Sequence, residues 1–247
     1  MSGKQHNQWA RYTVAREHRY LDDASYTKES NKHHKVFSKW LNTNFSGENL
    51  KIIDIGCGNG RVLEIINNPP TSILNNINYI GYDINTFCLD KAIKRYKNCK
   101  NVKFIELDID YEKIDEKVDI IYIDSILPML KNPYKTVLEL LNICDYIFFN
   151  RTTIHLGDMD DIQQTNEWAG MDKEQVSWVM VEKKLNNFLE KNNLKIEVLD
   201  YERIYLNSTI IDLSQLPDKE IDEMGKSYLI GNKKYSNGFV INKIKNG

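Results

Sequence analysis

An acidic residue and three alternating glycines stand together in the segment at 54–60, which reads DIGCGNG. The β-branched run at 52–55 predicts a buried strand, and the amphipathic stretch at 61–66 predicts the start of a helix. Glycine adopts positive φ angles and lets a ligand approach the backbone closely. A strand, a glycine turn and a helix in this order are typical of a site for a nucleotide-type cofactor.

The spacing of the glycines separates two classes of cofactor. A dinucleotide site requires G-x-G-x-x-G, which would place the third glycine at position 61. Arg61 stands there, and the third glycine is Gly60. Asp54, just before the turn, would repel a pyrophosphate and suits a cofactor that carries positive charge, such as an amino group or a sulfonium. The pattern therefore disfavours a nicotinamide oxidoreductase.

This segment resembles the first motif of the class I S-adenosylmethionine-dependent methyltransferases, acid-x-G-x-G-x-G. The resemblance implies S-adenosyl-L-methionine as the cofactor. It assigns the ribose hydroxyls to Asp83, at the end of a predicted strand, and the adenine to Ile84; capping of the next helix is the alternative role of Asp83. The implied cofactor-binding residues are Asp54, Gly56, Cys57, Gly58, Gly60, Asp83, Ile84, Asp108, Ile109 and Asp124.

Asp108 ends the next predicted strand, at 101–108. The family has an acid near the adenine amino group at this point, and the following residue, here Ile109, donates a backbone N–H. Asp110 competes with Asp108 for this role, and a solvated strand end is the alternative for both.

Asp124 and Ser125 end the predicted strand at 119–124, which faces the transferred methyl group in the family. Relatives that methylate amino groups of nucleic-acid bases often carry N/D-P-P-Y/F here. The sequence Asp-Ser-Ile-Leu departs from that pattern and argues against base N-methylation. Ile126 and Leu127 are expected to form an apolar wall around the sulfonium.

A base is needed only if the acceptor is a hydroxyl. His155 follows the predicted strand at 144–150, and its unperturbed pKa of about 6.5 suits proton removal near neutrality. A surface histidine is the alternative role, and Asp124 is the alternative base. The candidate catalytic residues are therefore His155 and Asp124.

Four more residues are candidates for binding the acceptor, namely Tyr20, Tyr26, Arg151 and Trp168. The forked donors of Arg151 suit a carboxylate or phosphate, and an ion pair with Asp158 or Asp160 is the alternative. The aromatic residues are candidates for a lid over the acceptor, and ordinary core packing is their alternative role.

No metal site is expected. His33 and His34 are adjacent, so on a helix they diverge by about 100°, and neither they nor His6 and His18 have a carboxylate at a metal-ligand spacing. The cysteines at 57, 88, 99 and 144 form no C-x-x-C pair, which argues against a zinc site or disulfides and fits a reducing cytosol.

Alternating strands and helices must position these residues. Strand-like patterns lie at 51–55, 78–83, 101–108, 119–124, 144–150, 195–205 and 239–245, and helix-like patterns at 61–67, 86–97, 133–142 and 173–192. The alternation predicts an α/β fold with a Rossmann-like, doubly wound and mostly parallel sheet of seven strands. The resemblance implies that the last strand is antiparallel and lies beside the sixth.

We expect two parts in the chain. Residues 1–49 form an N-terminal helical lid or extension, and 50–247 form the class I methyltransferase domain, with insertions at 153–171 and 207–237. The stretch at 153–171 is predicted to be a polar connection.

The composition limits the partners. The chain has 247 residues, a net charge of −2 and a pI near 6.2, which gives no general attraction to nucleic acid. No run approaches the roughly 20 apolar residues of a membrane span, and the N-terminal segment has no signal-peptide core, so a cytoplasmic protein without a membrane partner is expected.

The sequence thus predicts an S-adenosylmethionine-dependent methyltransferase for a small polar acceptor, at a hydroxyl oxygen of a metabolite or glycan precursor. An RNA or protein methyltransferase is one alternative. A non-catalytic cofactor-binding module with the same fold is the other.

Overall fold

The computed structural model describes residues 32–45, 49–66, 77–150, 152–155, 162–165, 176–205 and 233–244. The helices are α3 (Lys32–Asn44), α4 (Val62–Ile66), α5 (Thr86–Arg95), the 3₁₀ helix η2 (Leu127–Met129), α6 (Pro133–Leu140) and α7 (Glu182–Lys191). The strands are β1 (Leu50–Ile55), β2 (Ile77–Asp83), β3 (Val102–Glu106), β4 (Ile120–Asp124), β5 (Tyr146–Asn150), β6 (Thr152–His155), β7 (Ile162–Thr165), β8 (Val176–Val181), β9 (Leu194–Tyr205) and β10 (Lys233–Lys243).

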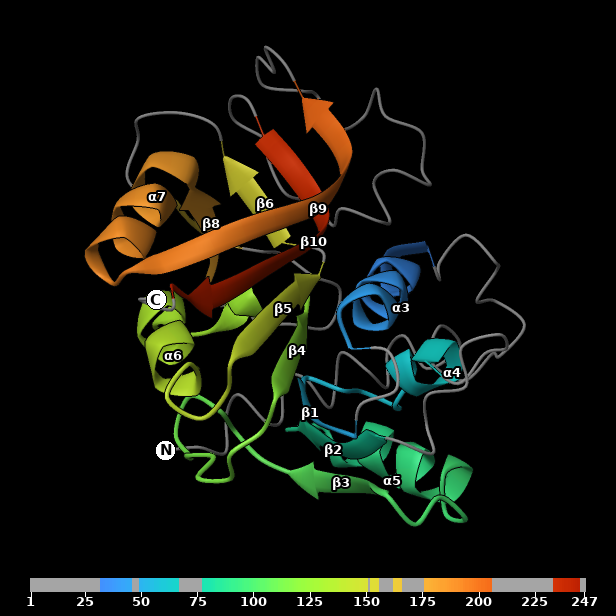
Figure 1. Ribbon diagram of the computed structural model, residues 1–247. Coiled ribbons are helices and arrows are strands. Elements are labelled where there is room, and N and C mark those ends of the chain that lie inside the picture. The colour runs from blue at the N-terminus through green and yellow to red at the C-terminus, as the bar shows by residue number, and fades with distance from the viewer. Residues whose placement is uncertain are drawn as a thin grey trace.

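The strands form one continuous sheet in the order β3-β2-β1-β4-β5-β10-β6-β8-β7, and β9 pairs with β10 (Figure 1). The strands from β1 to β5 are parallel, whereas β10 is antiparallel to both β5 and β9. The prediction of a Rossmann-like, mostly parallel sheet is therefore confirmed. The predicted antiparallel last strand is β10, and it lies beside β9, the strand predicted at 195–205.

The prediction is wrong between residues 153 and 181. The expected polar connection contains β6 and β7, and the first part of the helix expected at 173–192 is the strand β8. The segment Val-Ser-Trp-Val-Met-Val is rich in β-branched residues, and its apolar spacing also fits a helix. Pairing with β6 and β7 decides in favour of the strand, and α7 begins only at Glu182.

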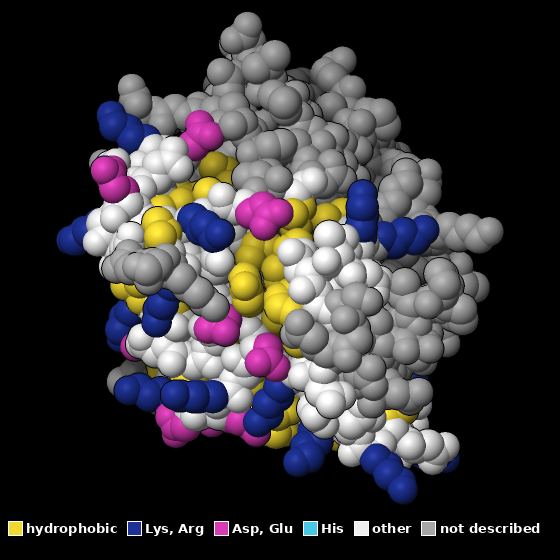
Figure 2. All heavy atoms as spheres, in the orientation of Figure 1, with side chains coloured by type: hydrophobic (Ala, Val, Ile, Leu, Met, Phe, Trp, Pro, Cys, Tyr) yellow, Lys and Arg dark blue, Asp and Glu magenta, His cyan; other side chains and the backbone are white. Residues whose placement is uncertain are grey.

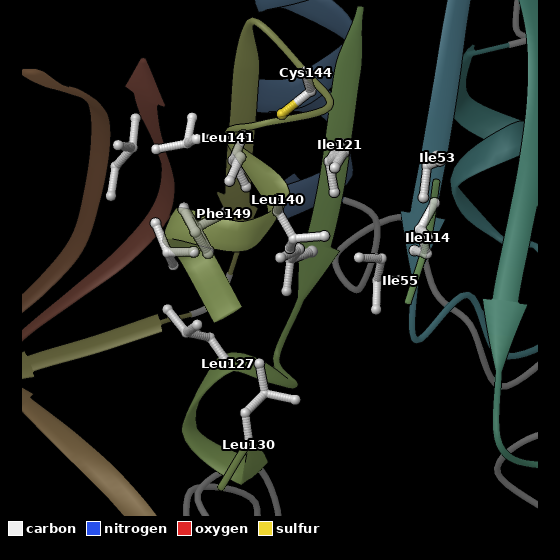
Figure 3. Packing of buried hydrophobic residues seen from close by; sticks show 14 of the residues in the cluster. Ile53, Ile55, Ile114, Ile121, Leu127, Leu130, Leu140, Leu141, Cys144 and Phe149 are labelled. Carbon is white, nitrogen blue, oxygen red and sulfur yellow. The ribbon is translucent and has the colours of Figure 1, made fainter. Parts of the chain in front are cut away.

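The two faces of the sheet bury alternate residues of the same strands. Ile53, Ile55 and Ile121 pack on one face with α6 and α7, and Figure 3 shows part of this cluster beside Leu140 and Leu141. The neighbouring residues of the strands pack on the other face against α3 and α4. Burial on both faces explains why the central strands are nearly continuous apolar runs.

Helix α3 is part of the packed core. The Phe37 ring lies 4.4 Å from that of Tyr122 and 4.7 Å from that of Phe148, measured between ring centroids. Trp40 packs on Phe148 and Tyr146. In Figure 1, α3 and α4 lie on the opposite side of the sheet from α6 and α7. This part of the predicted N-terminal extension therefore covers one face of the sheet.

Candidate functional site

The strand order creates a switch point at β1. The chain proceeds from β1 to β2 and β3 on one side and then places β4 on the other side of β1. Open parallel sheets bind ligands beyond the carboxyl ends of the strands at such a point. The glycine turn follows β1 here, with φ angles of +77° at Gly56, +53° at Gly58 and +78° at Gly60.

The three glycines have different neighbours. A Cβ on Gly56 would lie 2.6 Å from Cγ2 of Ile126, and a Cβ on Gly60 would lie 2.9 Å from the rings of Phe104 and Tyr96. A Cβ on Gly58 would meet no described residue within 4 Å. Packing alone therefore requires glycine at the two outer positions, whereas the middle one borders open space.

Asp83, at the end of β2, is bound to this turn. Its Oδ2 accepts a hydrogen bond of 2.7 Å from the Gly58 N–H, and its Oδ1 accepts one of 2.8 Å from the Asn85 N–H. Burial raises the pKa of the Asp83 carboxyl, and these N–H groups oppose the rise. The cap of α5 is Asn85, whose side chain accepts from the Cys88 N–H at 3.2 Å. Asp83 is therefore not the helix cap.

Asp54 lies at the carboxyl end of β1 with only 2% of its surface exposed. Its Oδ2 accepts a hydrogen bond of 2.5 Å from the Tyr79 hydroxyl, and its buried Oδ1 has no hydrogen-bond partner among the residues that the structure describes. Burial raises the pKa of Asp54 to about 8; the Tyr79 bond opposes this, and the carboxylates of Asp124 and Asp83 add to it. The role of Tyr79 was not predicted, although a tyrosine in an apolar strand signals a hydroxyl that needs a partner.

Cys57 packs its thiol inside the protein and not at the surface of the turn. Its side chain is buried, and its Sγ lies 2.7 Å from the position of a Cβ on Gly81 in β2. The Cys57 N–H donates to the Tyr82 carbonyl at 3.1 Å. Burial raises the pKa of this thiol well above its ordinary value.

The segment after β3 brings Asp108 to the same edge of the sheet. The strand ends at Glu106, two residues earlier than predicted, and the Leu107 N–H donates to the Asp83 carbonyl at 3.1 Å. Asp108 is buried, and its Oδ1 accepts from the Asp110 N–H at 3.0 Å. This burial contradicts the alternative of a solvated strand end for Asp108. Ile84 and Ile109 are half-buried.

The ends of β4 and β5 carry a second polar group. Ser125 has a φ of +61°, and its hydroxyl donates to Oδ1 of Asp124 at 3.2 Å. The Ser125 N–H donates to the Asn150 carbonyl at 3.1 Å, and the buried Asn150 amide donates to the Tyr122 hydroxyl at 2.7 Å. Asn150 and Tyr122 were not predicted, because the pairing of β4 with β5 creates this contact.

Only one of the two residues proposed as an apolar wall faces the turn. Ile126 is half-buried and lies against Gly56. Leu127 is 1% exposed and belongs to the hydrophobic core, as Figure 3 shows. The wall next to the glycine turn is therefore formed by Ile126.

His155 lies beyond the end of β5 along the sheet. It is the last residue of β6, paired with Lys233 of β10, while Phe149 of β5 pairs with Phe239 of the same strand. These partners are six positions apart in β10, which corresponds to roughly 20 Å along the strand. The side chain of His155, and residues Tyr20, Tyr26, Arg151 and Trp168, lie outside the part of the chain that the structure describes.

The described surface is mixed in charge. On the face in Figure 2, the Lys and Arg side chains are interspersed with Asp and Glu side chains. Within the described ranges, no group of three His, Cys, Asp or Glu side chains could hold a metal ion. No helix among these residues has both the length and the apolar character required to cross a membrane.

Comparison with known families gives a match over residues 46–193 to a family described as a methyltransferase domain. Among curated proteins, putative methyltransferase 235L of Invertebrate iridescent virus 6 is 32% identical over 108 residues. That match covers 44% of this chain and 38% of the viral protein, so it spans well under half of that relative's length.

Solved structures share the fold at low sequence identity. The N-terminal domain of EvdMO1, determined in the presence of SAH and D-fucose, matches with a TM-score of 0.60 and 12% identity over 87% of this chain and 84% of that one. The O-methyltransferase of a Brevibacillus brevis trans-AT PKS, in complex with S-adenosyl-L-homocysteine, matches with a TM-score of 0.59 and 15% identity. This match covers 98% of this chain and 81% of that one. Magnesium protoporphyrin IX methyltransferase (ChlM) of Synechocystis PCC 6803, with bound SAH, matches with a TM-score of 0.58 and 12% identity. This match covers 97% of this chain and 98% of that one.

Proposed function

Because this chain belongs to the methyltransferase domain family, in its class I form that uses S-adenosylmethionine, we propose that it methylates a small polar acceptor. The proposed target is a hydroxyl oxygen of a metabolite or glycan precursor. The observation that carries the proposal is the junction of the glycine turn with Asp83, next to open space at Gly58.

The residues around the turn fit the cofactor. A carboxylate has about four lone-pair sites, so Asp83 retains acceptor capacity for a ribose hydroxyl beside its bonds from the backbone N–H groups of Gly58, Asn85 and Ile84. The open space at Gly58 allows a ligand to approach the backbone. Asp54 supplies an acidic environment for a cationic group. The residues proposed to hold the cofactor are Asp54, Gly56, Cys57, Gly58, Gly60, Asp83, Ile84, Asp108, Ile109 and Asp124.

The cofactor supplies a methyl group that is already activated on a sulfonium. The protein therefore has to position the acceptor in line and exclude water. Ile126 provides an apolar contact next to Gly56. For a hydroxyl acceptor, a base must also take up a proton.

Two residues are proposed for this base. Asp124 lies at the strand end itself, and its carboxylate orientation is fixed in part by the hydroxyl of Ser125. His155 lies farther along the sheet, at the end of β6. The acceptor itself is proposed to lie among Tyr20, Tyr26, Arg151 and Trp168.

Two observations support a small hydroxylated acceptor. One structural neighbour was determined with D-fucose and another is named as an O-methyltransferase. The mixed charges on the described face provide no continuous basic surface for nucleic acid. Both support the class of acceptor rather than one compound.

The test uses the full chain with S-adenosylmethionine labelled on its methyl group. A panel of hydroxylated small molecules, including sugars, is compared with total RNA and with a protein mixture. We expect label to appear in a small molecule. Transfer to RNA, with an affinity that falls steeply with salt, would support the nucleic-acid alternative. Cofactor binding without transfer to any member would support the non-catalytic alternative.

A further inference from the structure

Among the described residues, no positive charge balances the enclosed Asp54 carboxyl. Only 2% of the residue is exposed, the Tyr79 hydroxyl donates to Oδ2, and no donor in the described part of the chain reaches Oδ1. An ionised carboxylate with an unsatisfied oxygen in such surroundings is costly. A neutral carboxylic acid is the form that this environment favours.

The neighbouring elements add negative charge. The charged groups that act most strongly on Asp54 are the carboxylates of Asp124 at the end of β4 and of Asp83 at the end of β2. Within the described ranges, the Tyr79 phenol and the Cys57 thiol are also titratable neighbours, and both remain neutral because burial raises the pKa of each. Tyr122 of β4 pairs with Asp54 of β1, and its hydroxyl accepts from the Asn150 amide.

We propose that Asp54 carries a proton in the cofactor-free protein and releases it to solvent when the ammonium group of the cofactor binds beside the glycine turn. The inference rests on the proposed function, because it requires a cationic ligand at this turn. The step is balanced: the carboxylic acid becomes a carboxylate next to the bound ammonium, and the buffer takes up the proton.

The pH window follows from the environment of Asp54. Burial raises its pKa to about 8, so the acid is mostly protonated at pH 7. A cation beside it favours the ionised form and lowers this pKa. Binding at pH 7 should then release roughly 0.9 of a proton, and affinity should rise by up to about tenfold per pH unit below 8.

The experiment is calorimetric titration of the full chain with S-adenosylhomocysteine in buffers of different ionisation enthalpy. The slope of observed heat against buffer enthalpy counts the protons released. Because the ligand amine can also titrate, the contribution of Asp54 is the difference between the wild type and Asp54→Asn. We expect a difference of close to one proton at pH 7 and a small difference at pH 9.

Two further measurements keep the test decisive if Asp54→Asn binds poorly. 5′-Methylthioadenosine has the adenosine but no ammonium, so the wild type should bind it without releasing a proton. Tyr79→Phe removes the donor to Oδ2, so proton release should extend to pH 9. Tight binding of S-adenosylhomocysteine at pH 7 without proton release would overturn this inference alone. No binding of either ligand would instead contradict the proposed function.

Discussion

The backbone N–H of Gly58 donates a hydrogen bond of 2.7 Å to Oδ2 of Asp83, which joins the turn after β1 to the end of β2. The two residues are 25 positions apart in the chain. The bond fixes the carboxylate and the turn relative to each other before any ligand arrives. Changes on either side of it are therefore expected to affect cofactor binding more than folding.

Replacement of Asp83 by alanine should weaken binding of S-adenosylhomocysteine. Hydrogen bonds to a charged group contribute about 1.5–3 kcal/mol, which corresponds to a loss of roughly ten- to a hundredfold in affinity. Calorimetric titration measures this loss. Asp90→Ala is the matched control, because Asp90 is exposed on α5 and should bind normally. Equal affinity of the Asp83 variant and the control would remove Asp83 from the site.

Gly58→Ala and Gly60→Ala should separate binding from stability. Both glycines have positive φ, so alanine costs each roughly 1–2 kcal/mol of folding free energy. At Gly60 the new Cβ would also meet Phe104 and Tyr96 at 2.9 Å, and overpacking adds about 1–3 kcal/mol. At Gly58 it would enter the open space proposed for the ligand.

Urea unfolding and titration with S-adenosylhomocysteine test this pair. Gly60→Ala should show the larger loss of stability. Gly58→Ala should show the larger loss of affinity relative to its stability, on the order of tenfold. Wild-type affinity in Gly58→Ala would mean that the open space is not the ligand site.

The free energy of unfolding of Asp54→Asn, relative to that of the wild type, should increase as pH rises. The folded-state pKa of Asp54, about 8, lies above its unfolded value near 3.9. Between these values the folded state holds a proton that the unfolded chain has lost. The contribution of Asp54 to the stability of the wild type therefore falls as pH rises and levels off above about pH 8. Asparagine does not titrate. The stability difference should therefore grow by on the order of a few kcal/mol from pH 5 to pH 9.

Urea unfolding of both proteins at pH 5, 7 and 9 checks this expectation. Groups that do not interact with Asp54 titrate alike in the two proteins, so their contributions cancel in the difference. A difference that stays constant with pH would show that Asp54 is ionised throughout the range.

Ser125→Gly should raise stability and change the site. A non-glycine residue with φ of +61° carries backbone strain of roughly 1–2 kcal/mol, which glycine relieves. The same substitution removes the hydroxyl that donates to Asp124. Asn193→Gly is the control, because Asn193 has a φ of +52° and follows the C-cap residue of α7, Asn192.

Thermal unfolding and methyl-transfer rates compare these two variants. Both should be at least as stable as the wild type, with a smaller gain for Asn193→Gly because asparagine tolerates this conformation. Only Ser125→Gly should lower turnover. An unchanged rate in Ser125→Gly would show that the strained residue has no part in the reaction.

The choice of base can be tested once an acceptor is identified. If His155 is the base, His155→Ala should lower turnover by about 10²–10⁴-fold, because general bases contribute this range. Its affinity for S-adenosylhomocysteine should remain at the wild-type value. Wild-type turnover in this variant would leave Asp124 as the candidate, since Asp124 ends β4 beside the turn.

The local sequence is sufficient to identify the turn and the central strands. Glycine spacing and apolar runs are local properties, so β1, β2, β4 and β5 lie within two residues of their predicted bounds. Asp83 and Asp124 are the last residues of β2 and β4, and Asp54 is the last but one of β1. Parallel strands place their carboxyl ends at one edge of the sheet, which is why their proximity was predictable.

Contacts between distant residues depend on strand register and pairing, and these become known only in the folded chain. The bond from Tyr79 to Asp54 requires that Tyr79 pairs with Ile52, and that from Asn150 to Tyr122 requires the alignment of β4 with β5. The segment 176–181 has apolar spacing compatible with a helix, and its neighbours β6 and β7 make it a strand. Burial of Asp54, and hence its high pKa, likewise arises from packing that no local pattern encodes.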